Sequence, residues 1–222
     1  MIKKISYVLS VIVCIGLFLG SWFGILSMGV TEVLGFITGA LCVWLTVKEN
    51  IWNWPIGTAN SVFFAILFWQ SRLFADMGLQ VVYIVLGFLG WYWWIYGGKN
   101  KSSLRVSHLS LTTGLMLILI GIVSTFGMMR YLVSIQDSSP FLDALTTVMS
   151  LVAQYLLTKK YIENWYVWIS ADLIYIYLYF SRGLSLTAVL YFIFLCMCVQ
   201  GLRDWVRLNA WKEYTRHKSL FC

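Results

Sequence analysis

The stretch Asn164-Trp-Tyr-Val-Trp-Ile-Ser-Ala-Asp-Leu-Ile-Tyr-Ile-Tyr-Leu-Tyr179 is apolar and aromatic along its whole length, yet it contains one acidic residue, Asp172. The other acidic residues all lie at or near the ends of hydrophobic segments: Glu32, Glu49, Asp76, Asp137, Asp143, Glu163, Asp204 and Glu213. A carboxylate at mid-membrane depth needs a partner inside the protein, and such groups commonly mark substrate or ion pathways. If this stretch crosses a membrane, Asp172 is the first candidate for a functional residue.

The composition of the whole chain is that of a membrane protein. Hydrophobic residues make up 60% and charged residues 11% of the sequence, whereas about 25% of the residues of a soluble domain are charged. Eight hydrophobic runs are seen, at roughly 5–29, 33–47, 51–70, 76–97, 110–134, 141–158, 163–181 and 183–206. Several are close to the ~20 residues that span a bilayer as a helix, and none shows the alternation of a membrane barrel. The sequence predicts an all-α polytopic membrane protein.

The basic residues predict its orientation, because lysine and arginine near the spans are retained on the cytoplasmic side. With eight spans and both termini cytoplasmic, every lysine and arginine falls inside except Arg72, Arg130 and Arg182. The net charge of +7 is then a topology signal that also attracts anionic lipid, and it gives no reason to expect a nucleic-acid partner. The first run, within residues 1–30, is expected to be an uncleaved N-terminal helix, with a cleaved signal peptide as the alternative.

Two parts of the chain repeat each other. The segment from Leu45 to Trp54 parallels the segment from Leu157 to Trp168, and both precede a hydrophobic run. Further matches pair Ser71-Arg72 with Ser181-Arg182, Tyr83 with Tyr191, and Gly90 and Trp94 with Gly201 and Trp205. We therefore expect three-helix repeats at 31–98 and 139–206, a loop and linker helix at 99–138, and a cytoplasmic tail at 207–222. A single linker crossing makes the two repeats parallel, in a 3+1+3 arrangement preceded by the extra helix.

Polar residues within these runs are the candidates for a binding site. The candidates from the first repeat are Asn53, Asn60, Gln80 and Tyr83, and those from the second are Asn164, Trp165, Trp168, Asp172 and Tyr191. Aromatic faces attract cations and stack on planar rings, and a desolvated carboxylate supplies the opposite charge. The set would suit a flat, positively charged small molecule. Alternatively, the amides hold neighbouring helices together, the tryptophans anchor the interface, and Asp172 pairs with an amide or hydroxyl.

The same motifs resemble those of the PnuC family of nicotinamide riboside transporters. The resemblance is carried by the segments 49–60, 73–83 and 90–94, and by 163–168, 190–191 and 201–205, and it covers about residues 33–206. It implies uptake of nicotinamide riboside across a bacterial inner membrane by a full-length relative of the SWEET sugar transporters. It also implies facilitated diffusion by alternating access, a substrate site near the midplane between the repeats, no cofactor, and a homotrimer.

Other classes of function are weighed against this one. An enzyme is disfavoured because the only histidines, His108 and His217, lie in polar stretches and no hydrolase, metal or phosphate-binding motif occurs. A proton-coupled transporter of another planar vitamin, such as thiamine, is the closest alternative, since a buried Asp172 could carry the proton. A scaffold that transports nothing would use the polar residues only to pair helices.

Overall fold

The computed structural model of the protein describes residues 30–70, 74–136, 139–181, 183 and 185–218. The α helices within this part of the chain are α2 (Val30–Val47), α3 (Asn53–Gln70), α4 (Phe74–Tyr96), α5 (Leu111–Ser134), α6 (Pro140–Thr158), α7 (Asn164–Ser181) and α8 (Ser185–Lys218), with a short 3-10 turn, η1 (Lys99–Lys101), after α4. The structure is therefore all-helical, as the sequence predicts. The expected N-terminal helix lies outside the described residues.

The turns that follow α2 and α6 have the same shape. Glu49, with φ of 50°, and Lys160, with φ of 54°, both adopt the left-handed conformation that commonly ends a helix. The backbone bonds that close the two turns also match: Asn50 N donates to Leu45 O at 2.9 Å, and Tyr161 N donates to Leu156 O at 3.0 Å. The chain thus reverses direction in the same way before α3 and before α7.

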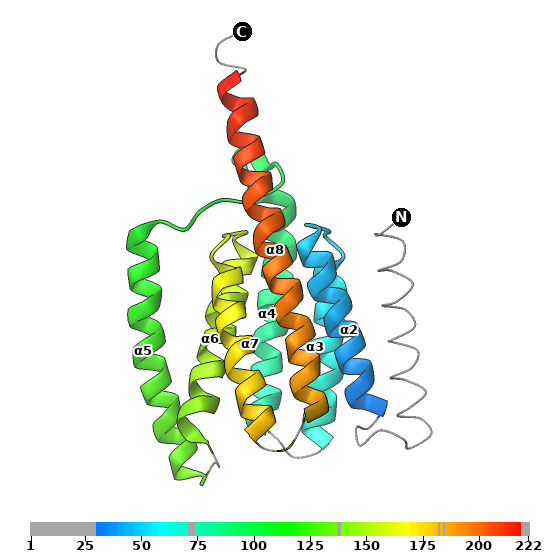
Figure 1. Ribbon diagram of the computed structural model, residues 1–222, viewed down its shortest axis with the longest axis vertical. Helices are drawn as coiled ribbons and strands as arrows, with labels where there is room; N and C mark the ends of the chain where they lie inside the picture. Colours follow the sequence, from blue (N-terminus) through cyan, green and yellow to red (C-terminus); the bar gives the residue numbers. More distant parts are fainter. Residues whose placement is uncertain (1–29, 71–73, 137–138, 182, 184, 219–222) are drawn as a thin grey trace.

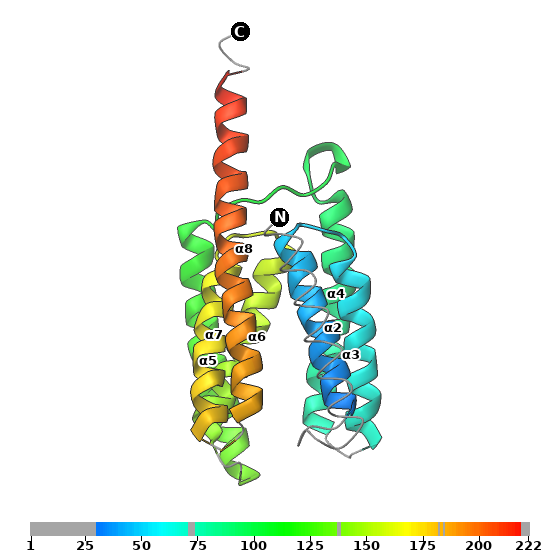
Figure 2. The ribbon, with the colours of Figure 1, turned by 45° about the vertical axis from the view of Figure 1, so that its right-hand side comes forward.

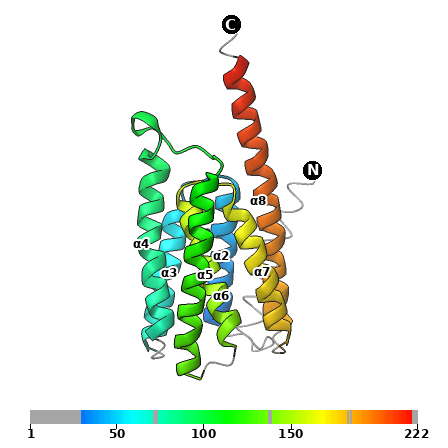
Figure 3. The ribbon, with the colours of Figure 1, turned by 90° about the vertical axis from the view of Figure 1, so that its left-hand side faces the viewer.

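Six of the helices form a closed ring. Going around it, α2 packs against α3, α3 against α4, α4 against α6, α6 against α7, α7 against α8, and α8 against α2. Figure 1 shows these helices side by side, and Figure 2 shows α2, α3 and α4 on one side with α6, α7 and α8 on the other. Helix α5 lies outside the ring against α6, and Figure 3 views the bundle from that side.

The outer surface of the bundle is apolar. Leu111, Leu119 and Val123 of α5 are 79%, 64% and 64% exposed, as expected of side chains that face lipid rather than water. In the described part of the chain, four helical segments are long and apolar enough to cross a membrane: Met77–Tyr96, Leu111–Ser134, Pro140–Thr158 and Thr187–Trp211. Helix α2 contributes a shorter apolar segment, Val33–Val47. The architecture is that of a multi-pass membrane protein.

Helices α3 and α7 are not among these four segments, although both coincide with predicted runs. Each contains amide and aromatic residues that lower its hydropathy, and α7 also contains Asp172. Both are enclosed on two sides by ring neighbours, so polar side chains can point away from lipid. These two helices carry six of the nine candidate site residues.

Helix α8 differs most from its predicted bounds. The hydrophobic run ends near residue 206, and we expected a separate tail from 207, but the helix continues to Lys218 and projects beyond the bundle (Figure 1). No glycine or proline follows Gly201 in this helix, so nothing interrupts it. Hydropathy marks where a helix leaves the apolar layer rather than where it ends.

Candidate functional site

A cluster of four tryptophans forms the core at the end of the ring where α2, α4 and α6 finish. Trp54 and Trp94 meet edge to face with ring centroids 5.4 Å apart, and Trp165 and Trp205 meet in the same way at 5.3 Å. Trp94 and Trp205 lie 6.1 Å apart and join the two pairs. All four side chains are buried. The cluster therefore links α3 and α4 to α7 and α8 across the ring.

One tryptophan of each pair packs against a glycine. A Cβ atom at Gly90 would lie 2.2 Å from the ring of Trp54, and one at Gly201 would lie 2.5 Å from the ring of Trp165. Gly201 follows Gly90 by 111 positions, and Trp165 follows Trp54 by the same number. The two glycines are needed because the indole rings occupy the space of a side chain.

Two indole hydrogen bonds connect neighbouring helices of the ring, α4 with α6 and α8 with α2. Trp94 Nε1 donates to Leu157 O on α6 at 3.1 Å, and Trp205 Nε1 donates to Thr46 O on α2 at 3.3 Å. These partners are also separated by 111 positions, so the two bonds are equivalent. The sequence comparison above paired Thr46 with Thr158 instead; the structure shifts that match by one residue.

An ion pair lies beside the tryptophans. Lys160 Nζ is 3.1 Å from Glu49 Oε2, and the side chains are only 7% and 18% exposed. Lys160 also donates to Leu104 O at 3.1 Å and lies 4.2 Å above the ring of Trp94. The turn after α2 is thereby fastened to the turn after α6 by a largely buried charge contact.

Asp172 is the buried carboxylate of α7. It is 4% exposed, and its Oδ2 atom has no hydrogen-bond partner among the described residues. The Cys198 thiol and Tyr191, both on α8, lie close enough to the carboxylate to interact with it. The nearby donor on α8 is therefore a thiol, a weaker donor than the amide or hydroxyl of the alternative interpretation. One carboxylate oxygen remains able to accept a hydrogen bond from a ligand.

A second aromatic cluster lies beyond Asp172, toward the opposite end of the ring. Tyr191 on α8 is 4.8 Å from Tyr175 and 5.1 Å from Tyr179, both on α7. Phe36 of α2 packs against Tyr191 at 6.2 Å and against Phe194 at 6.0 Å. All five rings are partly buried. This cluster closes the junction of α2, α7 and α8 on the other side of the carboxylate.

Tyr83 connects this region to the opposite side of the ring. It lies on α4, beside Ser150 of α6 and within electrostatic range of Tyr175 on α7. Tyr175 also packs against Tyr191. Tyr83 is thus near the region of Asp172 and Tyr191, and that these residues form one binding site stays a prediction.

The remaining predicted residues are distributed differently. Asn53 and Asn164 are buried at the starts of α3 and α7, where Asn53 Nδ2 donates to Thr46 Oγ1 at 3.1 Å and Asn164 Nδ2 donates to Tyr161 O at 2.6 Å. Within the described part of the chain, neither of their side-chain oxygens has a partner.

Trp165 is fully buried in the tryptophan cluster, and Trp168 packs against that cluster while remaining partly buried. Asn60 and Gln80 are partly buried on α3 and α4, and among the described residues neither has a hydrogen bond to Asp172.

Several residues of this region were not among the predicted site residues. Tyr175 and Tyr179 share the helical face of Asp172, and Cys198 lies one helical repeat after Tyr191, so their spacing could have identified them. Phe36 comes from α2, which supplies none of the predicted site residues. Only the packing of α2 against α8 shows that it takes part.

Comparison with known proteins adds to this geometry. Residues 29–207 match the family model described as nicotinamide mononucleotide transporter. The nicotinamide riboside transporter PnuC of Escherichia coli (strain K12) is 30% identical over 201 residues, covering 79% of this chain and 84% of the relative. PnuC of Neisseria mucosa is 30% identical over 184 residues, covering 78% of this chain and 70% of the relative.

A relative with a different ligand in its name is also similar. The riboflavin/roseoflavin transporter RibM of Streptomyces davaonensis is 26% identical over 182 residues, covering 79% of this chain and 84% of RibM. Among solved structures, the crystal structure of the vitamin B3 transporter PnuC superposes with a TM-score of 0.69 at 25% identity, covering 94% of this chain and 92% of that one.

Proposed function

Since this chain belongs to the nicotinamide mononucleotide transporter family, and so is a transporter rather than an enzyme, we propose that it carries nicotinamide riboside across the membrane. Two relatives named nicotinamide riboside transporter match this chain over most of their own length. The substrate is a flat pyridinium cation joined to a ribose. The single observation that carries the proposal is the buried carboxylate of Asp172, with one oxygen unpaired and aromatic rings on both sides.

The proposed site lies near the midplane, between the two aromatic clusters. Asp172 offsets the charge of the pyridinium ring, while Trp168 and Tyr175 provide faces for it. The ribose hydroxyls require polar partners, which Asn60, Gln80 and Tyr83 supply from α3 and α4. Asn53, Asn164, Trp165 and Tyr191 surround this group and set the positions of its members.

The architecture we propose for this function is a pair of parallel three-helix units, α2–α4 and α6–α8, joined by α5. The ring order supports it, because exchanging α2 with α6, α3 with α7 and α4 with α8 leaves the set of neighbouring helices unchanged. The matched glycines, tryptophan pairs and left-handed turns support it as well.

Transport would proceed by alternating access, in which the two units rock about the bound substrate. The end with the tryptophan cluster is closed in this structure by Trp94, Trp205 and the Glu49–Lys160 pair, all of which bridge the two units. Opening that end requires these contacts to separate. No energy source is needed for facilitated diffusion, which only equilibrates the substrate.

The positions of the basic residues support the proposed location and orientation. We place the chain in a bacterial inner membrane with both termini cytoplasmic, because Lys48, Lys99, Lys160 and Arg207 lie at the same end of the bundle. A homotrimer is proposed from the family resemblance, and the apolar outer face of α5 is available for such contacts.

Calorimetry with nicotinamide riboside on the purified protein tests the proposal. Asp172→Leu removes both the charge and the hydrogen-bond acceptor, so affinity should fall about 10- to 100-fold, the equivalent of ~1.5–3 kcal/mol for a hydrogen bond to a charged group. Asp172→Asn keeps an acceptor and should bind with intermediate affinity. Trp168→Ala should also weaken binding.

The matched control is Ser61→Ala, because Ser61 precedes Asp172 by 111 positions and occupies the corresponding place on α3. It should bind like the wild type. If the wild type itself gives no heat and does not exchange the riboside in vesicles, the substrate assignment is wrong.

A second candidate is a larger planar vitamin, and the similarity to RibM favours it. Riboflavin would use the same rings but would not need the carboxylate. Competition of riboflavin and thiamine against bound riboside separates these substrates, and repeating uptake across a pH gradient separates a proton-coupled carrier from a facilitator.

A further inference from the structure

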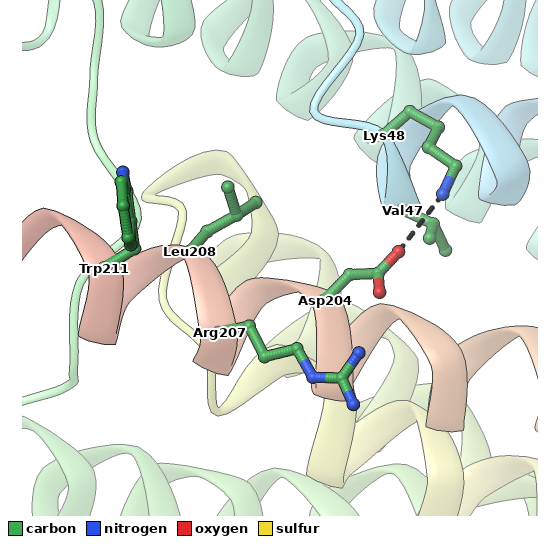
Figure 4. Close-up of a pocket in the computed structure, with 6 residues that line it drawn as sticks. All are labelled: Val47, Lys48, Asp204, Arg207, Leu208 and Trp211. Carbon is green, nitrogen blue, oxygen red and sulfur yellow. Dashed lines mark hydrogen bonds and ion pairs between the residues drawn. The ribbon is translucent and has the colours of Figure 1, made fainter.

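A pocket of about 340 Å³ lies where the end of α2 faces the projecting part of α8 (Figure 4). Its lining residues are Val47, Lys48, Asp204, Arg207, Leu208 and Trp211. Lys48 Nζ is 3.1 Å from Asp204 Oδ2, and both side chains are partly exposed. Two basic groups and one acidic group leave the pocket with an excess of positive charge.

The corresponding corner of the other unit is filled. Lys159 takes the place of Lys48, and its ammonium lies 3.2 Å above the ring of Trp93, which takes the place of Asp204. Burial lowers the pKa of Lys159. Helix α4 also ends at Tyr96, so it supplies no counterpart of the last turns of α8. The pocket exists only because α8 continues beyond the bundle.

The chemistry of the lining selects an anion with an apolar or planar attachment. Lysine and arginine are the side chains that bind phosphate, arginine through its fork of N–H donors and lysine as a point charge. Val47, Leu208 and Trp211 add apolar walls, and Trp211 is 65% exposed. The apolar segment of α8 ends at Trp211, so the pocket lies near the boundary between the apolar layer and water.

We propose that this pocket binds a phosphate group, carried either by the headgroup of an anionic phospholipid or by a soluble phosphate ester. Lys48 belongs to one three-helix unit and Arg207 to the other, so a phosphate held by both would brace the junction between α2 and α8. The site is separate from the riboside site and does not depend on which substrate is transported.

Native mass spectrometry of the purified protein tests the lipid, with phosphatidylglycerol compared against phosphatidylcholine. The double variant Lys48→Gln with Arg207→Gln should weaken phosphatidylglycerol binding about 20-fold, since each basic residue near the surface contributes about fivefold. Arg105→Gln is the matched control, because Arg105 is an exposed basic residue that is not part of the pocket. It should leave binding unchanged.

Calorimetry with inorganic phosphate and with a nucleoside monophosphate tests the soluble source. If these bind and the double variant abolishes their binding, the ligand is a soluble phosphate; if only phosphatidylglycerol responds, it is a lipid. The proposal is overturned if neither ligand responds to the double variant, or if Arg105→Gln has the same effect. Riboside binding should be unchanged in the double variant, which separates this result from a failure of the transport proposal.

Discussion

Helices α3 and α7 begin alike and then diverge. Each opens with an asparagine and a tryptophan, Asn53-Trp54 and Asn164-Trp165, and each tryptophan packs on a glycine of the following helix. Even their unsatisfied groups match, because the same side-chain atoms of all four residues lack partners within the described residues. The first turns of both helices serve one structural purpose, which is to hold the tryptophan cluster closed.

Beyond the first turns the chemistry is different. At corresponding positions α3 has Gly57, Ser61, Phe64 and Phe68, where α7 has Trp168, Asp172, Tyr175 and Tyr179. The geometry stays similar, since Phe64 and Phe68 stack at 5.8 Å and 27° while Tyr175 and Tyr179 stack at 6.0 Å and 20°. The matched residues thus support the fold and its closure, whereas at the unmatched positions the carboxylate and the two tyrosine hydroxyls lie on α7 alone.

The largest loss of stability is expected from breaking the Glu49–Lys160 ion pair, which joins the turn after α2 to the turn after α6. Lys160→Met removes the ammonium group that faces the largely buried Glu49 carboxylate, and removal of one member of a buried pair costs about 3–5 kcal/mol. The thermal unfolding midpoint of the purified protein measures this. The double exchange Glu49→Lys with Lys160→Glu should recover only part of the loss, because it restores the ion pair but neither the hydrogen bond to Leu104 O nor the contact with the Trp94 ring.

Lys48→Met is the control for this prediction. Its ion pair with Asp204 is much more exposed, so its loss should cost less than about 1 kcal/mol. Equal effects of Lys48→Met and Lys160→Met would show that the buried pair does not hold the closure.

The next largest loss of stability is expected from adding a methyl group at Gly90 or Gly201, where an indole ring packs against the glycine. Gly90→Ala and Gly201→Ala each push a methyl group into an indole ring, and overpacking of this kind costs about 1–3 kcal/mol. The two variants should lower the unfolding midpoint by similar amounts. Gly127→Ala has no atom within 4 Å of the added Cβ and should be neutral; a large difference between Gly90 and Gly201 would break the equivalence of the two units.

A smaller effect is expected from the two indole hydrogen bonds, which join α4 to α6 and α8 to α2. Trp94→Phe and Trp205→Phe each remove one bond, worth about 1 kcal/mol, in addition to the loss of ring volume. Trp54→Phe and Trp165→Phe lose the same volume but no hydrogen bond, since these Nε1 atoms have no partner in the described part of the chain. The contribution of the hydrogen bonds is the difference in unfolding free energy between the Trp94 and Trp205 variants and the Trp54 and Trp165 variants.

The smallest effect is expected on riboside affinity at Tyr175, a position where α7 differs from α3. Tyr175→Phe keeps the ring and removes only a hydroxyl, so riboside affinity measured by calorimetry should fall about two- to fivefold, as for one neutral hydrogen bond. The reciprocal change, Phe64→Tyr on α3, should leave affinity unchanged. An equal response of the two variants would place the substrate centrally rather than against α7.

The sequence predicted the helices well where lipid exposure determines their limits. Helix α5 was expected at 110–134 and occupies Leu111–Ser134, and α6 was expected at 141–158 and occupies Pro140–Thr158. Hydropathy works here because these segments face the apolar layer. It says nothing of α8 after residue 206, where the helix continues as a projecting segment that carries charged residues.

The sequence named some residues of the region around Asp172 and missed others, and their role in binding stays a prediction. Tyr83 and Tyr191 lie near this region in the structure, but the thiol of Cys198 and the ring of Phe36 also join it, from α8 and α2. Contacts between distant helices depend on how the ring closes, which no local pattern records. The matches of Thr46 to Thr158 and of Trp54 to Trp168 were wrong because only residue identity was compared. The structure pairs Trp54 with Trp165, which packs on Gly201 as Trp54 packs on Gly90.

The Glu49–Lys160 pair carries a consequence for the history of the chain. Lys160 follows Glu49 by 111 positions, so the two residues occupy the same place in the two proposed units and meet each other. In an ancestral protein of one unit, assembled from two identical copies, this contact would have set glutamate against glutamate or lysine against lysine, and like charges so close repel. Opposite charges can occupy the two positions only in a chain whose halves are encoded separately. If the proposed units arose by duplication, the pair marks their later divergence.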